Sequence, residues 1–88
     1  PFPGVAEREQ IWRGAFPPGV PGVLALDFRA LARPSLTGGQ IRNIALCAAF
    51  LAASQGQPVG MRHILDAARS EYQKSERPLN ENEVRGWL

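Results

Sequence analysis

Ten consecutive apolar residues, from Ile44 to Ala53, constrain this 88-residue chain more than any other feature of its sequence. The run is too short to span a membrane, which needs about 20 apolar residues, and its length fits a buried core helix better. It shows no polar side for nearly three turns after Asn43, so most of this helix cannot be exposed to water. We therefore expect a central helix that other helices surround.

The start of this central helix is marked by Thr37 and Gln40, which have the spacing of a capping box. This spacing predicts a helix that begins near Gly38 and continues to about Ser54. The single cysteine, Cys47, lies inside it and cannot form an internal disulfide. We expect a buried structural thiol in a reducing cytoplasm.

The rest of the chain predicts further helices and one irregular loop. Asp27 suits the N-cap of a short helix, and Pro17 to Gly22 is a proline- and glycine-rich connector. The longer apolar stripes predict helices over about Val5–Ala15 and Met61–Lys74. The expected fold is all-α, a four- to five-helix bundle with the central helix at 38–54.

We expect residues 1–77 to form the bundle and residues 78–88 to form a C-terminal tail with a short helix. In that tail, Asn80 and Glu83 have capping spacing and precede Val84, Trp87 and Leu88. Burial of Trp87 against its own bundle is the preferred interpretation, and a partner contact is the alternative.

Composition excludes several classes of function. Ten basic and eight acidic residues leave a net charge of +2, which by itself implies no partner. One histidine and one cysteine cannot supply a metal site, and His63 is expected to be structural or exposed to solvent. No nucleophile and base stand together and no GxxxxGK[ST] loop is present, so we expect no catalytic residue in this chain.

The candidate binding residues are Gly38, Gly39 and Arg42, at the start of the central helix. A helix N-terminus presents free amides and partial positive charge, and glycines let a ligand approach the backbone closely. The planar fork of an arginine binds phosphate oxygens. These residues predict an anion site, while the alternative is that the glycines shape a tight turn and Arg42 is solvated.

The order of several short motifs resembles the C-terminal small helical lid domain of AAA+ ATPases, over about residues 1–74. The motifs are Phe2-Pro3, Arg8, Ile11-Trp12 and Phe16-Pro17, then Asp27-Phe28 with Leu31-Ala32, then Leu36-Thr37-Gly38-Gly39 with Ile41-Arg42-Asn43, and finally Val59, Met61, His63-Ile64 and Ala67. The third group resembles the sensor-2 segment. From the opening Pro1-Phe2-Pro3-Gly4 we also expect this chain to be a piece of a longer protein.

The resemblance implies a role in ATP binding, ATP sensing and coupling between subunits. Gly38 and Gly39 would lie against the adenine and ribose, and Arg42 would be the sensor-2 arginine that reaches the γ-phosphate. The Mg²⁺ ion and the hydrolytic residues would belong to the large nucleotide-binding domain of the same chain, so this piece alone would not hydrolyse ATP.

The implied partners are that large domain and the neighbouring subunits of a homohexameric ring in the cytoplasm. An exposed apolar patch is expected where the large domain packs, with Phe2, Ile11 or Trp12 as candidates.

Two other interpretations stay open. Asp27 to Ser54 has the order of a helix-turn-helix module, but only Gln40, Arg42 and Asn43 precede the apolar run, and a recognition helix needs more polar side chains. We therefore expect no direct binding of nucleic acid. A free-standing helical protein-interaction domain would use the same bundle and give Arg42 no role with a nucleotide.

Overall fold

The central helix of the sequence is present as α3, Gly38–Ser54, in the computed structural model, which describes residues 2–87. Around it lie three further α-helices, α1 (Val5–Ala15), α2 (Phe28–Leu31) and α4 (Met61–Lys74), and a short 3₁₀ turn over Val23–Ala25. The described residues contain no strand. The prediction of an all-α bundle is therefore confirmed for residues 2–87.

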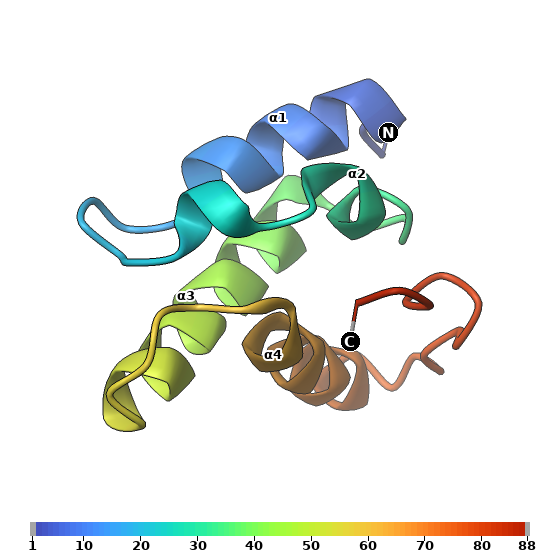
Figure 1. Ribbon diagram of the computed structural model, residues 1–88. Coiled ribbons are helices and arrows are strands. Elements are labelled where there is room, and N and C mark those ends of the chain that lie inside the picture. The colour runs from blue at the N-terminus through green and yellow to red at the C-terminus, as the bar shows by residue number, and fades with distance from the viewer. Residues whose placement is uncertain (1, 88) are drawn as a thin grey trace.

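α3 is the element on which the other long helices pack. α1 and α4 both contact it, whereas α2 contacts α1, and Figure 1 shows α3 passing between α1 and α4. α3 buries the positions that recur every three or four residues along one side, as an amphipathic helix does. These positions are Ile41, Ile44, Ala45, Ala48 and Ala52.

The opposite side of α3 is open, which corrects the expectation that helices surround it. Phe50 is 69% exposed and Leu46 is 47% exposed, and Cys47 between them is also exposed. Two long helices cover only part of the circumference of a third, and α2 is placed on α1 instead of closing the remaining side. The expected buried thiol is therefore wrong.

The N-terminal apolar residues divide between surface and core. Phe2 is 63% exposed and Ile11 is half-buried. Trp12 is fully buried, so it cannot contribute to a patch. Its ring meets the ring of Trp87 edge-on at 6.4 Å, an arrangement that aromatic pairs favour.

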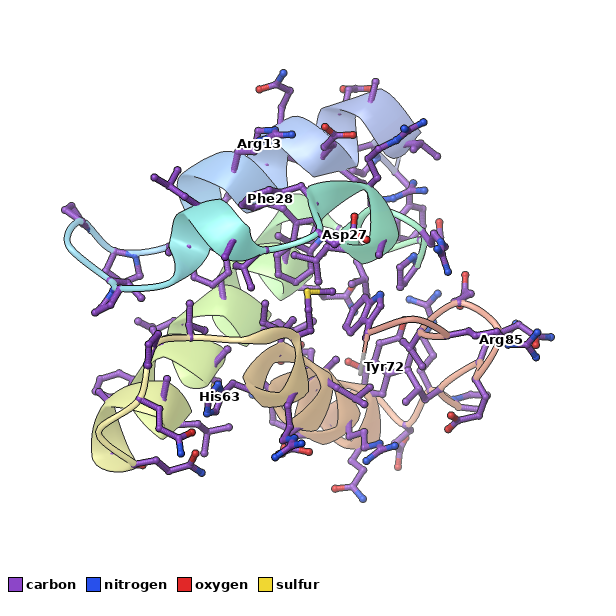
Figure 2. The ribbon with its side chains drawn as sticks, viewed as in Figure 1. Arg13, Asp27, Phe28, His63, Tyr72 and Arg85 are labelled. Atoms are coloured by element: carbon purple, nitrogen blue, oxygen red, sulfur yellow. The ribbon has the colours of Figure 1, made fainter. Side chains whose placement is uncertain are left out.

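α2 is held to α1 by local chemistry that the sequence partly predicts. The Asp27 carboxylate accepts a hydrogen bond from the Ala30 amide at 3.1 Å, which confirms the predicted N-cap. The guanidinium of Arg13 on α1 lies 4.6 Å from the centre of the Phe28 ring (Figure 2). A cation over an aromatic face is attractive, so this contact holds the short helix against α1.

Residues 81–86 form successive turns, so the short helix expected in the tail is wrong for the described residues. The Asn80 side chain accepts a hydrogen bond from the Asn82 amide at 2.9 Å, which makes an Asx turn in place of a helix cap. Gly86 has a φ of +93°, a left-handed conformation that interrupts a helix. Leu88 lies outside the described residues.

Trp87 is fully buried in the same core as the helices. Its preferred interpretation, packing against its own bundle, is therefore confirmed. None of the helices in residues 2–87 is both long enough and apolar enough to cross a bilayer.

Candidate functional site

The start of α3 is fixed by the capping box that the sequence predicts. The Thr37 hydroxyl accepts a hydrogen bond from the Gln40 amide at 3.1 Å, and the Gln40 side chain accepts one from the Thr37 amide at 2.9 Å. Together the two bonds satisfy two of the donors that a helix start leaves free. The backbone that carries Gly38 and Gly39 is therefore held in one conformation.

Two amides remain free at this end of the helix, and they belong to the two glycines. The first bond along the helix runs from the Ile41 amide to the Thr37 carbonyl at 3.0 Å. Gly38 and Gly39 precede Ile41 and have no intrahelical acceptor. Since Gly39 is exposed and Gly38 half-buried, both amides lie at the positive end of the helix dipole near the surface.

The guanidinium of Arg42 lies beside Gly38. A Cβ atom added to Gly38 would be 3.3 Å from Nη2 of Arg42, slightly closer than side chains ordinarily approach, and 3.5 Å from Nη1, an ordinary contact. The same atom added to Gly39 would meet Thr37 Oγ1 at 3.9 Å and would leave Arg42 untouched. The missing side chain at Gly38 thus lets the guanidinium lie against the helix backbone.

Arg42 is exposed and carries a free positive charge for a ligand. The ion pairs among residues 2–87 join Arg13 to Glu9 and Lys74 to Glu71, and neither involves Arg42. A guanidinium and two amides on one helix end form a set of donors with no acceptor among them. Such a set can bind a phosphate or carboxylate group.

Arg8 is a buried arginine that ties segments of the bundle together, a role that sequence reasoning did not predict. Its Nε donates to the Ala32 carbonyl and its Nη1 donates to the Pro3 carbonyl, both at 2.7 Å, and the residue is 6% exposed. These bonds tie the N-terminal segment and the end of α2 to α1. The buried Leu36, which leads into the glycines, follows this anchored point by four residues.

Both ring nitrogens of His63 make contacts that link the two ends of the turn between α3 and α4. Its Nδ1 accepts from the Gly60 amide at 3.0 Å, and its Nε2 lies 2.9 Å from the Gln55 side-chain oxygen, to which it donates in that tautomer. Both ring nitrogens are therefore used at the turn between α3 and α4 (Figure 2). Residues 2–87 also contain no cluster of three or more potential metal ligands.

A second feature that the sequence did not predict is an apolar hollow beside the open side of α3. It measures about 450 Å³ and is lined by Cys47, Phe50, Leu51 and Ser54 of α3 and by Ala67 and Ser70 of α4. None of these side chains is charged. The pattern of ten apolar residues contained this face, but only the arrangement of the neighbouring helices shows which residues stay uncovered.

Comparisons of this chain with protein-family models, with curated proteins and with solved structures found no match.

Proposed function

We propose that this chain is the lid domain of an AAA+ ATPase, in which it contributes to ATP binding and sensing. The observation that carries the proposal is the position of the Arg42 guanidinium beside Gly38, next to two free amides at the start of a helix anchored in the core. The order of the four helices and of the motifs on them supports the same assignment.

The residues present fit a phosphate-bearing ligand. The Arg42 guanidinium lies where a side chain at Gly38 would be, next to the free amides of Gly38 and Gly39, and guanidinium and amide groups are hydrogen-bond donors. In the proposed protein, Gly38 and Gly39 would lie against the adenine and ribose of ATP, and the Arg42 side chain would extend away from Gly38, beside which it lies in this structure, to reach the terminal phosphate. ATP would supply the phosphoryl group and Mg²⁺ would neutralise its charge, and a large nucleotide-binding domain of the same chain would hold most of both.

The mechanical part of the proposal follows from the rigidity of α3. Arg42 lies on a helix whose buried side contacts both α1 and α4. A movement of α3 when Arg42 meets a nucleotide would therefore move α1 and α4 with it. In a homohexameric cytoplasmic ring, that movement would reach the neighbouring subunit. The exposed Phe2 would pack against the large domain.

Three variants of the full-length protein test the nucleotide role. Arg42→Ala should lower ATPase turnover while leaving the helical circular dichroism and the unfolding midpoint unchanged. Gly38→Ala places a Cβ 3.3 Å from the Arg42 guanidinium, which needs to shift only slightly, so this variant should lower turnover much less than Arg42→Ala, and Gly39→Ala is the matched control. Wild-type turnover in Arg42→Ala would overturn the proposed role.

A free-standing protein-interaction domain is the second candidate, and the open side of α3 favours it. Phe50 and Leu46 are exposed beside an uncharged hollow, as at docking surfaces of other proteins. In that case Phe50→Ser would abolish association with the partner, and Arg42→Ala would have no effect on any activity. The helix-turn-helix alternative has little support, because Arg42 is the single basic residue that α3 offers to a groove.

A further inference from the structure

The C-terminal tail, residues 78–87, is attached to the helices at very few points. Only Val84 and Trp87 are buried in it, with Leu79 and Glu83 half-buried, and its other side chains are exposed. Its backbone bonds are local, from the Glu83 amide to the Asn80 carbonyl and from the Trp87 amide to the Val84 carbonyl. A segment with so few buried contacts has low local stability.

Two side-chain hydrogen bonds join the tail to the helices among the described residues. The indole Nε1 of Trp87 donates to the Ala30 carbonyl at 2.9 Å, and Nη1 of Arg33 donates to the Arg85 carbonyl at 2.7 Å. Both bonds reach α2 or the residues directly after it, although α2 lies more than fifty positions earlier in the chain. The tail therefore makes its hydrogen bonds to the rest of the bundle near its end, while Val84 and Leu79 add apolar contacts with the core.

The indole of Trp87 fills a position that no helix occupies. α2 and α4 do not contact each other, and Figure 1 shows the end of the tail lying between them. One side of the indole meets Trp12 of α1 edge-on, and another borders a hollow with Gly60 and Met61 at the start of α4. We call this position, bounded by Trp12, Ala30 and Met61, the indole slot.

The connection between α4 and the tail redirects the chain toward this slot. Glu76 has a φ of +53°, a left-handed conformation that residues other than glycine rarely adopt. The Arg77 amide bonds back to the Tyr72 carbonyl at 3.0 Å, which ends α4 at this point. The tail therefore begins at a defined corner and returns along the bundle without continuing the helix.

We propose that the tail is a detachable latch, an intramolecular ligand whose indole occupies the slot between α1, α2 and the start of α4. The packing of α1 and α4 on α3 does not pass through the tail, so the latch opens while those three helices stay folded. An open latch exposes a slot that accepts an indole whose N–H can donate to the Ala30 carbonyl, beside the bond that this carbonyl accepts from the Arg33 amide. This inference does not depend on the proposed nucleotide role.

Hydrogen exchange on the intact chain tests the opening directly. The indole N–H of Trp87 should exchange at least tenfold faster than the slowest amides of α3, and its rate should depend less on urea because less surface is exposed in the opening. Equal rates with equal urea dependence would show that the tail opens only with global unfolding, and would overturn the proposal.

Two matched variants, one in α2 and one just after it, distinguish local opening of the tail from a loss of stability of the whole fold. Arg33→Gln removes the bond to the Arg85 carbonyl and should speed exchange of the Trp87 indole N–H about five- to tenfold, the usual effect of one such bond. Arg29→Gln alters an exposed arginine of α2, four residues before Arg33, and should leave that rate unchanged. Faster exchange throughout α3 in Arg33→Gln, or equal effects of both variants, would contradict the latch.

A synthetic peptide of residues 78–88 tests the slot as a binding site. Added to the chain carrying Trp87→Ala, it should bind saturably and change the fluorescence of Trp12, and the same peptide carrying Trp87→Ala should not bind. Loss of the helical circular dichroism in the Trp87→Ala chain, or no binding of either peptide to a folded chain, would overturn the proposal.

Discussion

The substitution Gly22→Ala should destabilise this fold more than a glycine-to-alanine change in a loop normally does. Gly22 has a φ of +93° and lies where the proline-rich connector meets the turn before α4. A Cβ at this position would lie 2.6 Å from the Val59 carbonyl oxygen and 2.9 Å from the Pro58 Cβ. The first of these atoms belongs to the backbone, which cannot rotate away as a side chain can.

Two contributions make up the expected cost. Placing alanine in the left-handed region costs about 1–2 kcal/mol. Relief of the contact with Val59 must move the connector, and the hydrogen bond from the Val59 amide to the Pro21 carbonyl, now 2.9 Å, would be strained or lost, at a further cost of about 0.5–1.5 kcal/mol. The sum is about 1.5–3.5 kcal/mol, against a total stability of roughly 4–13 kcal/mol for a chain of this length.

Gly19→Ala is the matched control because Gly19 lies in the same connector with a φ of +81° and has nothing within 4 Å of its Cβ position. Gly19→Ala places alanine in the left-handed region but brings no close contact, so we expect it to lower the free energy of unfolding by about 1–2 kcal/mol. Urea titrations followed by circular dichroism give both free energies of unfolding. If Gly22→Ala costs no more than Gly19→Ala, the close approach of the connector to Val59 does not contribute to stability.

Two further stability predictions concern the helices themselves. Thr37→Ala removes the hydroxyl of the capping box and should lower the free energy of unfolding by about 1 kcal/mol, measured by urea titration. An unchanged free energy of unfolding would mean that the cap does not stabilise α3. The Tyr72 hydroxyl is buried and has no hydrogen-bond partner among the described residues, so Tyr72→Phe should leave stability unchanged or raise it by about 1 kcal/mol. Burial raises the pKa of Tyr72 above its ordinary value of 10.0, with a smaller opposing effect of Arg77, so the folded state holds the phenolic proton more tightly than the unfolded state. The contribution of the Tyr72 phenol to folding stability is therefore complete below pH 10 and is lost as the pH rises from 10 through the raised pKa of the folded state. If the stability of the Tyr72→Phe chain fell as steeply as that of the wild type between pH 9 and pH 11, Tyr72 would not be the cause of the fall.

Local chemistry predicted the helices of this chain well. The capping box at Thr37, the N-cap at Asp27 and the periodic apolar stripes each depend on residues within one or two turns of one another, and the helices they predict are present at those positions. The position of Arg42 beside Gly38 has the same origin, because residues four apart share one face of a helix. The candidate site could therefore be assembled from the sequence.

Contacts between distant residues could not be predicted in the same way. The open side of α3 depends on how many helices pack on it, which ten apolar residues in a row do not specify. The bond from Trp87 to the Ala30 carbonyl joins residues 57 positions apart, and nothing in the local pattern of either segment indicates the other. The tail helix was predicted from capping spacing alone, and the Asx turn at Asn80 prevailed over it.

The coding sequence upstream of Pro1 tests the central claim most directly, since a lid of this kind requires a large nucleotide-binding domain before it. We expect a GxxxxGK[ST] motif in the same reading frame within about 200 residues before Pro1, the usual length of one domain. An uninterrupted reading frame of that length without the motif would contradict the assignment of Gly38, Gly39 and Arg42 to a nucleotide site.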